Sequence, residues 1–155
     1  MSVGAVNLHA SAVQLAERGV IIFGASGSGK SALALELLRE ALRGDHQASL
    51  ISDDRVDLFL INDSLFASPP AQLAGLIEVR GSGIHQTRYA ASAQLHLAAE
   101  LVVESQAERM PPQAPRLIAH GAELPCLVLP GGHTAACARA ILAHLGLFPP
   151  LLPLG

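Results

Sequence analysis

A glycine-rich stretch near the N-terminus, FGASGSGKSALALELL (residues 23–38), constrains this chain more than any other feature. It matches the pattern G-x-x-x-x-G-K-[ST]. In such a loop the backbone N–H groups turn inward around an anion, the lysine reaches the β- and γ-phosphates, and the hydroxyl ligates Mg²⁺. The pattern therefore predicts a nucleotide-phosphate site made of Gly24, Ala25, Ser26, Gly27, Ser28, Gly29, Lys30 and Ser31.

The flanking residues favour this interpretation over an ordinary Gly/Ser turn. GVIIF (residues 19–23) is a short apolar run typical of a buried strand. SALALELLREAL (residues 31–42) places leucines on one face, as in an amphipathic helix. A chance match to the motif is roughly a 1-in-200 event in a chain of this length. Strand, loop and helix together predict an α/β fold whose helix directs its positive end at the phosphates.

Length and composition narrow the class of protein. The 155 residues suit one domain, spanning 1–155, with a core built from aliphatic residues because only 3% are aromatic. A net charge of −3 gives no reason to expect nucleic-acid binding. No apolar run reaches about 18 residues, which argues against a membrane span. The first residues carry no basic segment typical of an export signal, and Cys126 and Cys137 lack zinc-ligand spacing. We therefore expect a cytoplasmic protein with reduced thiols.

The rest of the chain reads mainly as strands and turns. The alternation in the middle of residues 5–19 predicts a strand, which turns back through Glu17-Arg18-Gly19 into the strand before the glycine loop. A Pro-rich loop is expected at 108–116, and a closing helix at 133–146 with Gly146 as its stop. The other predicted strands are 48–54, two runs within 55–68 joined by Asn62-Asp63, 74–84, 93–105 (with some helical character) and 123–132.

Three carboxylates could complete a phosphoryl-transfer site, which needs a metal-binding acid and a proton acceptor. Asp53 and Asp54 end an apolar strand, and adjacent strand residues point to opposite faces, so we expect different roles for them. A solvated turn is the alternative. Glu78 interrupts the apolar run LIEV, where a carboxylate is costly unless it binds a metal or a partner such as Arg80.

The pattern alone does not mark His9 or Arg109 as functional. A lone histidine in a polar break is more often structural, and an arginine in a Pro-rich loop is more often a surface residue. The other histidines show no ligand spacing with one another or with the cysteines. Alone, these residues predict no chemistry.

The motifs in order, HASAV…GVIIFGASGSGKSALALELL, ISDDRV and LIEVRGSGI, resemble the catalytic domain of HPr kinase/phosphorylase. That family moves phosphate between ATP or pyrophosphate and one serine of HPr, the phosphocarrier of the bacterial sugar phosphotransferase system. The resemblance implies a mixed sheet related to phosphoenolpyruvate carboxykinase, and often a hexamer. The chain is similar to short alphaproteobacterial forms that lack the extra N-terminal domain.

The resemblance also implies roles for individual residues. His9 falls on the family's active-site histidine and Lys30 on its phosphate-loop lysine. Asp54 falls on the residue that accepts the serine proton in phosphorylation and donates it in the reverse step. Arg109 falls on an active-site arginine in a mobile loop.

For the metal, the resemblance implies that Ser31 and Glu78 are Mg²⁺ ligands. Asp53 would help to hold the metal or to orient the substrate serine. The expected cofactors are therefore ATP and Mg²⁺, and the expected partner is HPr.

One departure from the family concerns the direction of the reaction. The family carries a basic segment of the form P-V-K-x-G-R-N that is tied to dephosphorylation, whereas LPCLVLPGGH (residues 124–133) has no Lys or Arg. We therefore expect a kinase with poor phosphorylase activity. A small-molecule kinase and a non-catalytic nucleotide sensor remain the alternative functions.

Overall fold

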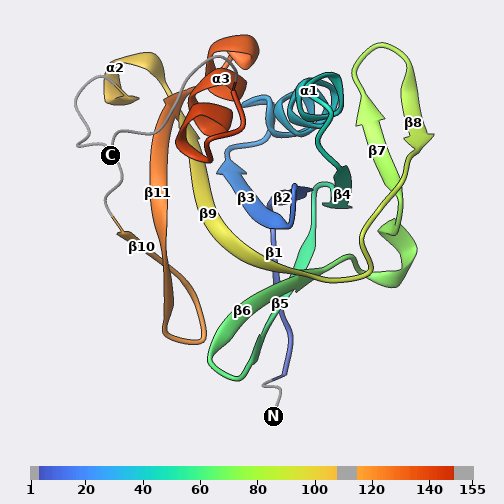
Figure 1. Cartoon of the computed structure of the whole chain (residues 1–155), viewed down its shortest axis with the longest axis vertical. Coiled ribbons are helices and arrows are strands. Elements are labelled where there is room, and N and C mark those ends of the chain that lie inside the picture. The colour runs from blue at the N-terminus through green and yellow to red at the C-terminus, as the bar shows by residue number, and fades with distance from the viewer. Residues whose placement is uncertain (1–3, 108–114, 149–155) are drawn as a thin grey trace.

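The computed structural model describes residues 4–107 and 115–148. Figure 1 shows a strongly curved sheet with helices above it and a separate two-stranded ribbon at one side. The strands are β1 (Val6–Leu8), β2 (Ser11–Leu15), β3 (Arg18–Gly24), β4 (Ala48–Ser52), β5 (Val56–Ile61), β6 (Ser64–Ser68), β7 (Leu76–Val79), β8 (Gly83–Gln86), β9 (Ala93–Val102), β10 (Pro115–Ala119) and β11 (Ala122–Pro130). The helices are α1 (Lys30–Arg43), α2 (Glu104–Ala107), α3 (Thr134–His144) and the 3₁₀ turn η1 (Ala71–Leu73).

The sheet is mixed. Seven strands follow the order β1-β5-β6-β9-β3-β2-β4, and the β10-β11 hairpin joins through β11. The central strand β9 is parallel to β3 and to β11, whereas the other pairs in the sheet are antiparallel. Among the described strands, β7 and β8 pair with each other and with no other strand. This arrangement confirms the predicted mixed α/β fold.

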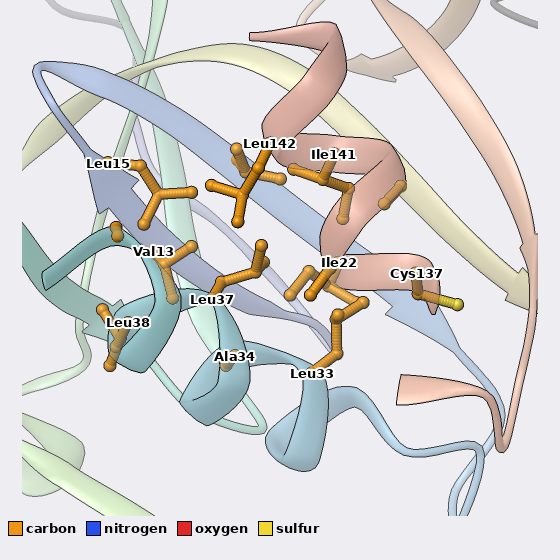
Figure 2. Close-up of a cluster of buried hydrophobic side chains, with 14 of the residues drawn as sticks. Val13, Leu15, Ile22, Leu33, Ala34, Leu37, Leu38, Cys137, Ile141 and Leu142 are labelled. Atoms are coloured by element: carbon orange, nitrogen blue, oxygen red, sulfur yellow. The ribbon is translucent and has the colours of Figure 1, made fainter. Parts of the chain in front are cut away.

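Apolar side chains fill both faces of the sheet because the strand residues alternate. Along β3, Ile22 belongs to the cluster beneath α1 and α3, whereas Ile21 belongs to a second cluster on the opposite face. Figure 2 shows Leu33 and Leu37 of α1 facing Ile141 of α3. The predicted amphipathic face of the helix therefore packs against the core.

Most predicted elements are confirmed, and the exceptions have local causes. Asn62 and Asp63 both have positive φ (50° and 66°), as a tight turn between β5 and β6 requires. Segment 93–105 is a strand to Val102, because sheet partners flank it on both sides. The predicted loop at 108–116 is wrong for its last two residues, which pair in β10, and its first seven lie outside the described residues. No helix in the described part of the chain is long and apolar enough to span a membrane.

Candidate active site

The glycine loop forms the turn between β3 and α1. Gly29 has φ 101°, a backbone conformation that residues other than glycine rarely adopt, and α1 begins at the next residue. The Lys30 side chain is buried, and its Nζ donates hydrogen bonds to the carbonyl oxygens of Gly24 (2.8 Å) and Ala25 (3.1 Å). The first turn of α1 holds no acidic residue. The loop thus combines a helix N-terminus with a lysine, a combination that suits phosphate.

Close packing explains why the loop needs its small residues. A Cβ on Gly24 would lie 2.4 Å from Ser28 Oγ, and one on Gly131, in the turn between β11 and α3, would lie 3.0 Å from the Ser28 carbonyl oxygen. The Ser28 hydroxyl is buried and has no hydrogen-bond partner among the described residues. A larger residue at Gly24 or Gly131 would therefore press on the loop at Ser28.

The buried carboxylate of Asp53 connects the loop to three other segments. It accepts hydrogen bonds from the hydroxyl of Ser31, at 2.7 Å from Oδ1 and 2.9 Å from Oδ2. The hydroxyl of Ser11 donates to Oδ1 at 2.7 Å, and the backbone N–H of Glu78 donates to Oδ2 at 3.1 Å. Residues from β2, β7 and the start of α1 thus converge on the carboxylate of the residue that directly follows β4.

Asp54 has a different environment, as expected for adjacent acids. Its side chain is exposed, and its Oδ1 lies 2.9 Å from Nε2 of His9. Its backbone has φ 72°, a left-handed conformation that aspartate tolerates better than most residues but that still carries strain. The structure therefore holds a reachable carboxylate at a fixed place beside the phosphate loop.

A cavity of about 850 Å³ joins these groups. Its wall includes Lys30, Ser31 and other residues of the phosphate loop, together with Asp53 and Asp54. The β7–β8 ribbon lines one side with Val79, Arg80 and Ile84. The cavity is large enough to hold a nucleotide and to admit part of a second substrate.

Glu78 also faces this cavity, but it is exposed. The argument that its carboxylate is buried in an apolar strand is therefore wrong, because successive strand residues face opposite sides and the buried one here is Ile77, which leaves Glu78 on the side of the cavity. Glu78 and Arg80 both lie in the described part of the chain, and none of the ion pairs found there joins them. Arg109 lies outside the described residues.

The oxygen donors at the loop fit Mg²⁺ better than a transition metal. Within residues 4–107 and 115–148, no three His, Cys, Asp or Glu side chains cluster as a metal site of their own. The hydroxyl of Ser31, the carboxylate of Asp53 and the carboxylate of Glu78 all border the cavity. Mg²⁺ commonly takes only one or two carboxylates and completes its shell with water and substrate phosphates, so these residues fit it.

The cysteines have no part in this site. Neither Cys126 nor Cys137 lines the cavity, and burial raises the pKa of both thiols. For Cys126 the carboxylate of Glu100 raises the pKa further, whereas Arg116 lowers it. Both thiols are therefore poor nucleophiles at neutral pH.

Ser11 is a member of the site that the sequence argument missed. The signal was available, because a serine interrupts the apolar positions of HASAV only two residues after His9. Its hydroxyl is completely buried, and a buried hydroxyl requires partners. Which partners it has could not be read without the sheet register.

Comparison with known proteins identifies the family. A family model described as the HPr Serine kinase C-terminal domain matches residues 3–127. The chain belongs to this family. Its solved relatives include the Hpr(Ser) kinase/phosphatase from Coxiella burnetii, which is 27% identical with a TM-score of 0.72 and is matched over 90% of this chain and 96% of that one. Both findings confirm the resemblance seen in the motifs and the mixed α/β fold.

Curated relatives within the family are longer than this chain. The HPr kinase/phosphorylases of Clostridium tetani (strain Massachusetts / E88) and Clostridium botulinum (strain Eklund 17B / Type B) are each 42% identical over 77 residues. The aligned segment is 50% of this chain but only 23% of each relative. The matches therefore establish the family of the domain, and they cover less than a quarter of each curated relative.

Proposed function

We propose that this chain is an ATP- and Mg²⁺-dependent protein serine kinase that phosphorylates HPr. The observation that carries the proposal is the hydrogen bond between Ser31, at the start of α1, and Asp53, which places Asp54 at the edge of the phosphate loop with its carboxylate exposed. Membership in the HPr Serine kinase C-terminal domain family supports HPr as the substrate.

In this proposal each residue performs one physical task. Bound Mg²⁺ would neutralise charge on the phosphates, and Ser31, Asp53 and Glu78 are the residues that would hold it. Lys30 exchanges its carbonyl partners for the β- and γ-phosphate oxygens and offsets their charge.

Asp54 accepts the hydroxyl proton of the incoming serine as that serine attacks the γ-phosphorus in line. The hydrogen bond from His9 fixes the direction of this carboxylate, leaving its second oxygen for the substrate. Positioning of this kind supplies much of the rate in phosphoryl transfer. Arg109 would add positive charge to the transferring group, as the family resemblance implies.

The charge distribution supports a preference for the forward direction. In the reverse step inorganic phosphate attacks phosphoserine, which brings a further anion to a cavity whose described wall holds four acids (Glu36, Asp53, Asp54 and Glu78) against Lys30 and Arg80. Strand β11 and the turn after it carry no Lys or Arg. Arg116 is engaged above the Phe23 ring at 3.8 Å and near Glu100 at 3.9 Å, and Arg139 is exposed on α3. We therefore propose that dephosphorylation is weak.

We also propose a location, an oligomeric state and a domain organisation. A kinase acting on HPr would work in the cytoplasm, where its substrate and ATP are present. The family resemblance further suggests a homo-oligomer, with a hexamer as the first arrangement to test by light scattering. We propose that residues 1–155 form a single catalytic domain in that assembly.

An assay with purified HPr and γ-labelled ATP tests the function. Transfer of label to a serine of HPr, dependent on Mg²⁺, is the expected result. Label appearing on a metabolite without HPr would instead identify a small-molecule kinase. Tight ATP binding with no transfer to either acceptor would identify a nucleotide sensor, and both results contradict the proposal.

A further inference from the structure

The buried hydroxyl of Ser11 occupies an unusual position between the two acids. It donates its proton to Oδ1 of Asp53 at 2.7 Å and accepts the backbone N–H of Asp54 at 3.2 Å. Ser11 is 0% exposed and begins β2, which pairs with β4 through Ala12 and Ser52. One side chain thus contacts both functional residues without facing the cavity.

The backbone around Asp54 needs such support because its conformation is strained. With φ 72°, Asp54 reverses the chain directly after β4, and the N–H of Arg55 bonds the carbonyl oxygen of Asp53 at 2.9 Å. Ser52 closes the same turn by donating its hydroxyl proton to the carbonyl of Arg55. The N–H of Asp54 points to Ser11, so loss of that acceptor would free the residue whose carboxylate is the proton acceptor.

The same hydroxyl sets the direction of the Asp53 carboxylate. Oδ1 is shared by Ser11 and Ser31, whereas Oδ2 is shared by Ser31 and the N–H of Glu78. If Ser31 were a ligand of bound Mg²⁺, Ser11 and the Glu78 N–H would still hold one oxygen each. Ser11 would then keep the plane of the carboxylate the same in the free and the loaded site.

From these contacts we infer that Ser11 is a positioning residue that couples the metal-binding acid Asp53 to the proton acceptor Asp54. This inference rests on the proposed function for the role of Asp54, but its part concerning Asp53 requires only Mg²⁺-dependent nucleotide binding. Ser11 touches no substrate, so it acts through the two acids.

The test compares Ser11→Ala with Val13→Ala, a matched control in the same strand. Val13 is also 0% exposed, but it packs in the cluster beneath α1 and does not line the cavity. We expect both variants to lower the melting temperature, because both truncate a fully buried side chain. A defect found only in Ser11→Ala is then due to the lost hydroxyl. Measurements are made below both melting temperatures.

The first readout is calorimetric binding of ATP at a series of Mg²⁺ concentrations. In Ser11→Ala we expect the Mg²⁺ concentration for half-maximal ATP binding to rise by about threefold or more, because misdirected ligands weaken metal sites by roughly 10-fold or more. Val13→Ala should keep the wild-type value. A wild-type value in Ser11→Ala, or the same rise in Val13→Ala, overturns the inference.

The second readout is the rate of phosphoryl transfer to HPr. We expect kcat of Ser11→Ala to fall by about tenfold or more with little change in KM for HPr, because misplacement of a reacting group costs up to about 100-fold. An unchanged kcat overturns the link to Asp54. If the wild-type protein does not phosphorylate HPr, the proposed function fails, while the binding measurement still decides the role of Ser11 toward Asp53.

A second variant covers the case in which Ser11→Ala does not fold. Ser11→Cys keeps the shape of the side chain but supplies a weaker donor and acceptor. We expect it to shift the Mg²⁺ dependence and kcat in the same directions by smaller factors. Wild-type values for Ser11→Cys overturn the inference as well.

Discussion

Replacement of Asp54 by asparagine separates its chemistry from its geometry. Asparagine also tolerates the left-handed backbone at φ 72°, and its amide oxygen can still meet Nε2 of His9. It cannot accept the serine proton. We expect Asp54→Asn to keep Mg²⁺-ATP binding within about threefold of wild type while kcat falls by about 10²- to 10⁴-fold, the usual contribution of a general base.

Replacement of Asp54 by glycine tests whether the backbone strain and the contact with His9 offset each other. A non-glycine residue in the left-handed region costs about 1–2 kcal/mol relative to glycine, less for aspartate. Asp54→Gly removes this strain but also removes the hydrogen bond to the half-exposed His9, worth about 0.5–1 kcal/mol. The two changes nearly cancel. We therefore expect a melting temperature within about 4 °C of wild type, since 1 kcal/mol shifts a chain of this size by about 2–4 °C.

The assays are label transfer to HPr, calorimetry with Mg²⁺-ATP and thermal unfolding, applied to Asp54→Asn, Asp54→Gly and Asp53→Asn. Asp53→Asn should weaken Mg²⁺-dependent nucleotide binding, because its carboxylate meets Ser31. The reasoning is refuted if Asp54→Asn loses Mg²⁺-ATP binding while Asp53→Asn binds normally without transfer. The two acids would then have the opposite roles.

Three further predictions concern the phosphate loop, Arg109 and the direction of the reaction. Lys30→Ala should reduce transfer to less than a tenth of wild type in the HPr assay, because the loop loses its only cationic side chain; a higher residual activity would reject the phosphate-loop assignment. Arg109→Ala should slow transfer with a nearly unchanged melting temperature, and a large drop in melting temperature with normal turnover would show a structural role instead. Phosphoseryl-HPr incubated with millimolar phosphate and no nucleotide should release pyrophosphate far more slowly than the forward reaction runs; comparable rates would show that Arg116 or another subunit supplies the missing charge.

Local sequence was sufficient for the parts of the site that depend on consecutive residues. The loop from Gly24 to Ser31 combines a φ requirement at Gly29 with a helix start at Lys30, and both are local properties of the backbone. The alternating residues of β2 and the continuous apolar run of β3 likewise predicted strands, since both patterns are visible in a short segment. Adjacent placement was enough to predict that Asp53 and Asp54 would differ in environment.

Contacts between distant segments were decided only by the tertiary structure. Periodicity tells which residues share a face, but it does not tell which strand becomes the neighbour or in which register. The pairing of Ala12 with Ser52 brings Ser11 beside Asp53, 42 residues away, and no local pattern encodes that match. Glu78 illustrates the converse. Its apolar neighbours suggested a buried strand, but only the face of β7 that carries Ile77 is buried, and the opposite face, with Glu78, borders the cavity.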